Sequence, residues 1–276
     1  MTFIFKNWDS FCAKLAKSGI LSVPANQISA DTSNFLVLKH DVETDVKKAL
    51  EIAKIEHKYN HRSSFYVQAY LLDSTANIAM LKEMQSMGHE ISYHYDVMDS
   101  NKGDIEKANS EFSKNKKLFE DNGFFLSTVC QHGNPVAERI GYTSNRDFFR
   151  NKDIQQLYPN ISDVMVNFKD KIPTNYIYFS DAGRKFNMIF DPINNDITDI
   201  SDKDVPYENL DELLKIIDID GRYIISTHPH RWTSSAFIYS IKATSFKIIR
   251  FVAKFLLKIP LFKKIMSKFY FLAKKI

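Results

Sequence analysis

Short apolar segments alternate with amphipathic helical patterns along most of this chain, and the alternation limits the folds open to it. The first apolar segment, Phe35–Leu38, is a continuous run typical of a strand buried on both faces. A helical pattern follows over residues 46–55, and then a β-type segment, Ser63–Gln68. Since parallel strands are joined by helices, this order predicts an α/β fold with a mainly parallel sheet or barrel.

The same alternation continues to the region of residue 227. Gly88 follows one helical pattern directly and is suited to end that helix. Residues 137–175 show no regular pattern. The helices expected are Asn7–Ser18, Ile78–Met87, Lys102–Asp121 and Leu210–Ile217, and the further strands are His89–Tyr95, Leu126–Cys130, Tyr176–Ser180 and Tyr223–Ser226.

Composition excludes several classes of protein. A chain of 276 residues, 44% hydrophobic, can build one large core or two small ones. Its two cysteines, Cys12 and Cys130, and the lack of close Cys/His pairs argue against a disulfide framework or a structural zinc module, and favour a reducing compartment. The first residues contain no long apolar run, so we expect no secretory signal and a cytoplasmic location.

Ionisable residues follow the predicted strands. Parallel strands of an α/β barrel present their carboxyl ends on one side, so these side chains are expected to converge there. The members of this set are Asp41, Glu43, His94, Asp96, His132, Asp181, His228 and His230.

The residue types in this set suit metal-assisted hydrolysis. Asp41 and Glu43 lie two apart and share one face of an extended chain. One carboxylate can bind a divalent metal while the other acts as general base toward water. Imidazole with carboxylate suits zinc, and also nickel, cobalt or iron, among which nothing in the sequence selects. His228 is placed to protonate a leaving group.

Each residue also has a structural interpretation. Asp41 can cap the helix that begins near Thr44, and His132 and Asp181 can be turn residues. His89 is expected to bond the backbone in the core, His40 to face away from Asp41, and His230 to be exposed. Asp96, Asp181, Arg184 and Trp232 are the candidates for substrate contact; for Arg184 and Trp232, packing is an equal alternative.

Four stretches of the chain resemble the polysaccharide deacetylase family, the NodB-homology metal-dependent amidases and esterases. These are Leu36–Glu43, Ser63–Val67, Gly88–His94 and Thr227–His228, and the stretches that resemble a divergent branch of the family are His40–Glu43, Gly88–Asp96, Ser180–Gly183 and Thr227–Trp232. Gly-His-Glu-Ile-Ser-Tyr-His is similar to the family's Gly-His-Glu-Ile-Gly-Asn-His and is the most specific match. The resemblance covers about residues 35–232 and is strongest to a divergent branch found around bacterial surface-glycan synthesis. It implies a distorted (β/α) barrel of about seven strands.

The resemblance also implies roles. Asp41 matches the family's catalytic base, Glu43 its metal-binding acid, His94 its first metal histidine and His228 its general acid, although Asp41 as ligand stays open. The family's second metal histidine corresponds to Met98, whose thioether is a poor ligand for such cations. Three alternatives follow: His132 or Asp96 completes the site, the metal is weakly held, or it is absent.

The last segment, Ser235–Ile276, differs in character from residues 1–234, and we treat it as a separate tail. It holds ten Lys or Arg residues and no Asp or Glu. Basic residues recur at helical spacing from Lys247 to Lys258 among apolar ones, and Pro260 interrupts the pattern. No uncharged run reaches the ~18–20 residues that span a bilayer. The tail therefore predicts a basic amphipathic helix at an anionic membrane surface, with packing on the barrel or on another subunit as the alternative. Nucleic-acid binding is not expected.

The function that these patterns favour is metal-dependent N-deacetylation of an N-acetylated sugar in surface-polysaccharide or lipid-linked glycan synthesis, at the cytoplasmic face of the membrane. The alternative is a non-catalytic glycan-binding or scaffold relative that has lost the metal. Other ester or cyclic-amide hydrolysis on the same scaffold is not distinguished by the sequence.

Overall fold

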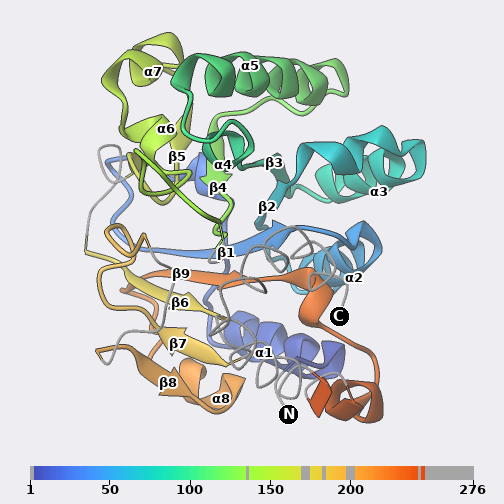
Figure 1. Cartoon of the computed structure of the whole chain (residues 1–276). Coiled ribbons are helices and arrows are strands. Elements are labelled where there is room, and N and C mark those ends of the chain that lie inside the picture. Colours follow the sequence, from blue (N-terminus) through green and yellow to red (C-terminus); the bar gives the residue numbers. More distant parts are fainter. Residues whose placement is uncertain are drawn as a thin grey trace.

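A computed structural model describes residues 3–134, 137–168, 175–181, 185–196, 203–241 and 244–245. Its framework is one sheet in the order β5-β4-β3-β2-β1-β9-β6-β7-β8, flanked by helices (Figure 1). Pairing is parallel from β5 through β6, and antiparallel for β6–β7 and β7–β8. The strands are β1 (Phe35–Val42), β2 (Ser64–Val67), β3 (Glu90–Tyr95), β4 (Thr128–Gln131), β5 (Ser162–Asp163), β6 (Ile177–Ser180), β7 (Phe186–Met188), β8 (Val205–Tyr207) and β9 (Arg222–Thr227).

The helices connect these strands, and side chains cap several of them. Asp45, rather than Thr44, caps the helix after β1, by accepting a hydrogen bond from the Lys48 amide at 3.1 Å. Gly88 adopts a φ of +89° just beyond the helix that precedes β3, as expected of a C-terminal glycine. The α-helices are α1 (Phe5–Lys17), α2 (Val46–Lys58), α3 (Thr75–Ser86), α4 (Val97–Ser100), α5 (Ile105–Asp121), α6 (Asp147–Arg150), α7 (Lys152–Leu157) and α8 (Leu210–Leu214).

The two faces of β1 belong to different cores. Leu36, Leu38 and Val42 lie in the large cluster that also contains residues of α1 and α2. Phe35 and Val37 lie in a smaller cluster on the other face. Because side chains alternate along a strand, the residues that continue the Phe35–Val37 face are Lys39, Asp41 and Glu43. The functional candidates of β1 thus share the face of the smaller core.

The expected alternation of strands and helices is confirmed, but the expected barrel is not. The described part of the chain forms a single sheet in which β5 and β8 are the two edges. The prediction also missed α4, and it missed β7 and β8, two three-residue strands that extend the sheet with antiparallel pairing. Segments this short carry too few residues for a periodic pattern to appear in the sequence.

Most of the tail lies outside the described residues. Its first part, 236–241, is helical, and the ring of Tyr239 lies 6.4 Å from that of Phe3. Phe237, Ile238 and Ile241 are exposed there. In the part of the chain that the structure describes, no helix combines the length and the hydropathy required to cross a membrane.

Candidate metal and acid-base site

Three side chains come together from three parallel strands: Glu43 follows β1, His94 lies on β3 and His132 follows β4. The possible ligand atoms of Glu43, His94 and His132 all lie within 4.8 Å of one another, and all three residues are buried. His132 Nε2 is 3.2 Å from Glu43 Oε1. The rings of His94 and His132 are 5.2 Å apart and almost perpendicular. Two imidazoles and one carboxylate therefore surround one small volume.

The hydrogen bond of His94 fixes which of its nitrogens faces this volume. His94 Nδ1 is 3.1 Å from the carbonyl oxygen of Cys130, and a carbonyl only accepts, so Nδ1 carries the proton. Nε2 then keeps its lone pair. Burial is the main cause that lowers the pKa of His94 to about 3, although the Asp41 charge opposes the shift. The imidazole is thus neutral at neutral pH, as a metal ligand must be.

The backbone of His132 is held on both sides. Its amide donates to the Tyr95 carbonyl at 2.7 Å, and its carbonyl accepts from the Asn145 side chain at 2.8 Å. Asn145 also donates to Asp99 Oδ2 and accepts from the Asp99 amide. His132 therefore extends the pairing of β4 with β3 and is not a free turn residue.

A buried lysine holds Asp41. Lys39 Nζ lies 2.7 Å and 2.6 Å from the two oxygens of Asp41, and 3.2 Å from Ser226 Oγ. Burial by itself would raise the pKa of Asp41, but Lys39, together with His94 and His228, outweighs it and the pKa is lowered. Asp41 is consequently an ionised carboxylate, although it is almost fully buried.

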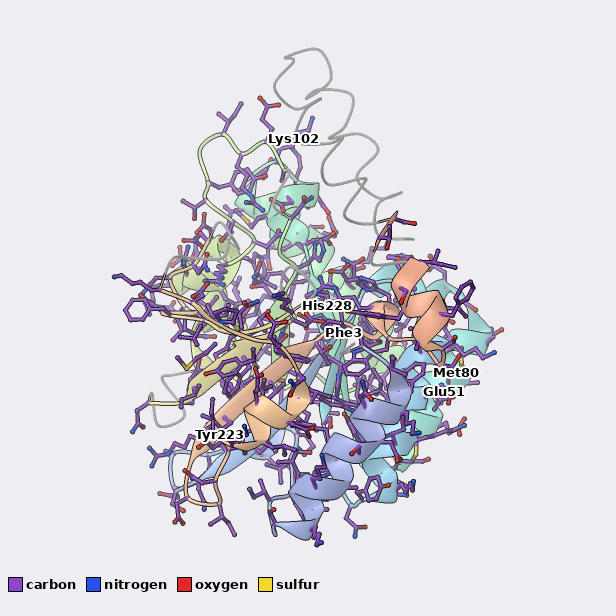
Figure 2. All side chains as sticks on the ribbon, turned by 90° about the horizontal axis from the view of Figure 1, so that it is seen from below. Phe3, Glu51, Met80, Lys102, Tyr223 and His228 are labelled. Atoms are coloured by element: carbon purple, nitrogen blue, oxygen red, sulfur yellow. The ribbon has the colours of Figure 1, made fainter. Side chains whose placement is uncertain are left out.

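His228 reaches the site from the end of β9. Its Nε2 is 3.7 Å from Glu43 Oε1 and 3.9 Å from Asp41 Oδ2. In Figure 2, Tyr223 marks the amino end of β9, and His228 lies just beyond the other end of the same strand. The side chain remains 16% exposed, so solvent has access to it.

Asp181 orients His228 from behind. Asp181 Oδ1 lies 2.7 Å from His228 Nδ1, and Oδ2 accepts from the His228 amide and the Thr227 hydroxyl, both at 2.9 Å. Arg231 Nη1 donates to the same carboxylate at 2.5 Å. Against the effect of burial, Arg231 and His228 hold the pKa of Asp181 well below its usual range. An ionised Asp181 accepts the Nδ1 proton, which directs Nε2 toward Asp41 and Glu43.

A second group that contains His94 is less suited to a cation. Asp41, His94 and Cys130 also place ligand atoms within 4.8 Å of one another. The ammonium of Lys39, however, contacts both Asp41 oxygens and would repel a cation there. Burial holds the pKa of Cys130 well above its usual value, so the thiol stays protonated. We therefore assign Glu43, His94 and His132 as the better ligand set, which leaves Asp41 as the base.

This ligand set fits a divalent cation. Two neutral imidazoles with one carboxylate are the donors of three-ligand catalytic zinc sites, which keep a fourth position open. Nickel, cobalt and iron accept the same donors. Met98 lies in the large hydrophobic core, and the second imidazole of this group belongs to His132, which follows β4.

The structure changes the interpretation of the predicted substrate-contact residues. Trp232 is fully buried among Phe3 and Trp8, and its indole donates to Thr227 Oγ1, so packing and not substrate contact explains it. Both oxygens of Asp181 are engaged by the protein, so it positions His228 instead of meeting a substrate. Asp96 is partly exposed near the site and joins neither metal group.

Two further residues of the prediction have different outcomes. Arg184 lies outside the described residues. His230, expected to be exposed, is only partly so, and its ring lies 5.7 Å from that of His228. The exposed position predicted for His230 is therefore wrong, because the turn after His228 folds it back toward the site.

Sequence reasoning missed three residues that shape this site: Lys39, Asn145 and Arg231. Lys39 carried a usable signal, because a lysine inside an apolar strand, two residues before an aspartate, is expected to form a buried ion pair. Asn145 lies in the irregular region and contacts the site through the backbone of His132. No local pattern marks such a residue.

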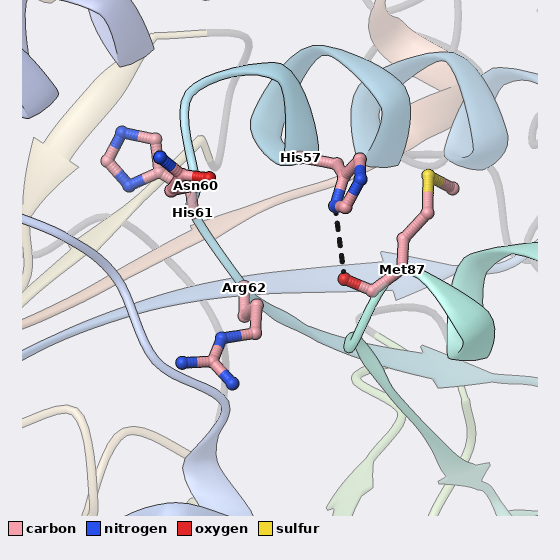
Figure 3. Close-up of a pocket in the computed structure, with 5 residues that line it drawn as sticks. All are labelled: His57, Asn60, His61, Arg62 and Met87. Atoms are coloured by element: carbon pink, nitrogen blue, oxygen red, sulfur yellow. Dashed lines mark hydrogen bonds between the residues drawn. The ribbon is translucent and has the colours of Figure 1, made fainter.

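A hollow elsewhere on the surface is separate from this site. It has a volume of about 190 Å³ and is lined by His57, Asn60, His61, Arg62 and Met87 (Figure 3). These residues precede β2 and β3 and so lie at the amino ends of the parallel strands. The candidate site lies at their carboxyl ends.

The chain was compared with known families, curated proteins and solved structures. No protein-family model matches the sequence, and no curated protein matches it. Two solved structures match this chain at low similarity. Peptidoglycan deacetylase PdaC from Bacillus subtilis is 11% identical, with a TM-score of 0.36 over 73% of this chain and 89% of that chain. A mutant of the same protein is 10% identical, with a TM-score of 0.35 over 82% and 98%. Similarity this low carries no functional argument, so the proposals below rest on the side chains.

Proposed function

We propose that this protein is a metal-dependent hydrolase that removes the acetyl group from an N-acetylated sugar. One observation carries the proposal: three metal-type ligands, an ionised carboxylate and an oriented histidine, from four strands, converge on one volume. A catalytic site requires a base, an acid and an electrophile within reach of one reacting bond. The resemblance of the same residues to the polysaccharide deacetylase family selects amide hydrolysis on a sugar among the reactions that such a site supports.

Glu43, His94 and His132 are the residues that would hold the cation. When bound, the cation would act as a Lewis acid toward water and the acetyl carbonyl. Asp41, ionised and held by Lys39, accepts the proton that the attacking water loses. Lys39 keeps the Asp41 carboxylate in a single orientation, because it contacts both oxygens.

His228 supplies the proton that the leaving amine requires. Because Asp181 accepts the Nδ1 proton, Nε2 is the nitrogen that faces the reacting bond, on the same side as Asp41 and Glu43. The carboxylate of Asp181 holds the His228 ring in this orientation, and Arg231 offsets the burial of the Asp181 charge. The two proton-transfer groups thus flank one volume.

The alternative of a non-catalytic relative has less support. It rested on Met98 in place of a metal histidine, and His132 provides an imidazole at ligand distance from Glu43 and His94 without it. Candidate acid and base groups beside the ligand set also favour a catalytic site.

The test is to measure bound metal and acetate release together. The purified full chain is supplied with zinc, nickel, cobalt or iron, its metal content is measured, and it is incubated with a tetrasaccharide of N-acetylglucosamine. We expect one bound cation per chain and release of acetate. A folded protein that binds none of these metals and releases no acetate would contradict the proposal.

We further propose a location for this activity, which the tail supports. The ten basic residues of Ser235–Ile276, with no acidic residue among them, complement an anionic leaflet, and the exposed Phe237, Ile238 and Ile241 begin its apolar side. Attachment there would hold the enzyme at the cytoplasmic face, beside a lipid-linked glycan.

A further inference from the structure

An exposed tyrosine stands beside the candidate site. Tyr70 follows β2 in the 3-10 helix η2 (Ala69–Asp73) and remains 54% exposed. Its hydroxyl donates a hydrogen bond to the backbone carbonyl of Glu43. The polar end of this ring is therefore held by the protein, while its apolar surface is exposed to solvent at the rim of the site.

The support beneath Tyr70 is firm. Leu71 and Leu72, its neighbours in η2, are buried in the large core. The Leu71 amide donates to the Gln68 carbonyl, and the Leu71 carbonyl accepts from the Asn77 side chain at 2.9 Å. A ring fixed at both its backbone and its hydroxyl loses little conformational entropy when a ligand covers it.

Two acidic residues, Glu43 and Asp96, lie near Tyr70. Besides burial, the nearby charges of Glu43 and Asp96 raise the pKa of the Tyr70 hydroxyl. Asp96 follows β3 directly, at the start of α4, and it is partly exposed. Among the described residues, none donates a hydrogen bond to the Asp96 carboxylate. A carboxylate that can still accept hydrogen bonds thus lies near enough to the exposed ring of Tyr70 for its charge to act on the Tyr70 hydroxyl.

We propose that Tyr70 and Asp96 form a binding subsite for a pyranose ring at the rim of the metal and acid-base site. A pyranose has an apolar face of C–H groups, which a tyrosine ring can cover, and hydroxyl groups at its edge, which a carboxylate can accept. The inference rests on the proposed function and adds the residues that would favour a hexopyranoside over a small acyclic amide. Tyr70 then determines specificity, while Asp41 and His228 carry out proton transfer.

A direct binding measurement tests the subsite. The affinity of the full chain for a tetrasaccharide of N-acetylglucosamine is measured by calorimetry for the native protein and four variants. We expect Tyr70→Leu to raise Kd at least tenfold, Tyr70→Phe to stay within threefold because the ring is kept, and Asp96→Asn to raise Kd several-fold. Phe125→Leu is the matched control, because Phe125 is 76% exposed but precedes β4, at the amino ends of the strands.

Two results would overturn the subsite. If Tyr70→Leu binds the tetrasaccharide as the native protein does, the ring makes no contact with sugar. If Tyr70→Phe loses as much affinity as Tyr70→Leu, the hydroxyl acts by holding the backbone of Glu43, and stacking is excluded. Thermal melting of each variant shows that loss of affinity is not loss of folding.

Kinetics separate this inference from the proposed function. The ratio of kcat/KM for the tetrasaccharide to that for an acyclic N-acetylated amine should fall at least tenfold in Tyr70→Leu, mainly through KM for the sugar. If the native protein releases acetate and this ratio does not change, the subsite is wrong and the hydrolase stands. If the native protein binds the sugar through Tyr70 but releases no acetate, the hydrolase is wrong and the subsite stands. Absence of both binding and release overturns both.

Discussion

Lys39 shows how a single buried residue sets the state of the site. A lysine inside a sheet loses the hydration of its charge, and it is kept ionised here by the two short contacts with Asp41. In return, the pKa of Asp41 is lowered against the effect of burial. Because Lys39 supplies the opposite charge, the Asp41 carboxylate stays ionised in a buried position that little water reaches, and it can still accept a proton.

Replacing Lys39 should therefore change the pH dependence of the reaction. A lowered pKa keeps Asp41 ionised down to acidic pH. In Lys39→Met the pKa of Asp41 rises, because burial is no longer opposed by the ammonium. We expect the acidic limb of the kcat/KM profile to move to higher pH by about one unit or more. An unmoved limb, in a variant shown to be folded by circular dichroism, would mean that another group provides the base.

If Glu43, His94 and His132 hold the metal, substitution of His132 should weaken metal binding and substitution of Met98 should not. His132→Ala removes a ligand and should weaken zinc binding at least ~100-fold, as measured by competition with a chelator. Met98→Leu is the matched control, because Met98 packs in the core, and its cost should stay below about 1.5 kcal/mol without change in metal affinity. Weaker zinc binding in Met98→Leu but not in His132→Ala would reverse the assignment.

At the scale of elements, a buried charge ties α1, α2 and β1 together. Glu56 of α2 lies 2.8 Å from His40 Nε2 of β1 and accepts from Trp8 Nε1 of α1 at 3.0 Å. Ser63 Oγ donates to its other oxygen at 2.6 Å. These contacts lie on the opposite face of β1 from Asp41, so they fix the helices behind the site without entering it.

Glu56→Gln should destabilise the fold and make it less sensitive to acid. Glu56 is fully buried, and removing a charged hydrogen-bond partner from such a place costs about 1–3 kcal/mol. Burial by itself would raise the pKa of Glu56, but His40, His89 and Ser63 together outweigh burial, and the pKa is lowered. The stabilisation is therefore present above the unfolded pKa of about 4.3 and is lost as pH falls through the folded pKa. Urea unfolding from pH 3 to pH 7 measures both effects. Glu51→Gln, on the exposed side of α2, should stay within about 0.5 kcal/mol.

At the scale of the whole molecule, charge is divided between the body and the tail. All 33 acidic residues precede Ser235, whereas the tail carries ten basic residues. A basic segment with many apolar residues binds anionic lipid surfaces, and each Lys or Arg near the surface contributes about 1 kcal/mol. The tail therefore gives the chain one end suited to a membrane surface.

Vesicle binding tests this division. The full chain should sediment with vesicles that contain anionic lipid, and raising the salt concentration should release it. The double variant Lys254→Glu and Lys258→Glu, which keeps the length of the chain, should bind more weakly. Equal sedimentation with uncharged vesicles, or no effect of the two substitutions, would indicate that the tail binds protein instead.

Much of this arrangement was predictable from local patterns. The continuous apolar run Phe35–Leu38 predicted β1, and alternation over His89–Tyr95 predicted β3 with His94 on the face opposite Ile91 and Tyr93; both are confirmed. The core role expected for His89 is also confirmed, because its two ring nitrogens bond the backbone of Ala53 and Ser63. These predictions succeeded because strand period and burial are properties of neighbouring residues.

The sequence by itself determined that strands ending in acid and imidazole groups alternate with helices, and hence which residues could act. The tertiary structure decided that, in the described part of the chain, one nine-stranded sheet carries them, that Glu43, His94 and His132 meet, and that Asp181 supports His228. Whether residues as distant in sequence as Glu43 and His132 meet depends on strand order and register. These are set by packing across the whole sheet and leave no trace in any short segment of the chain.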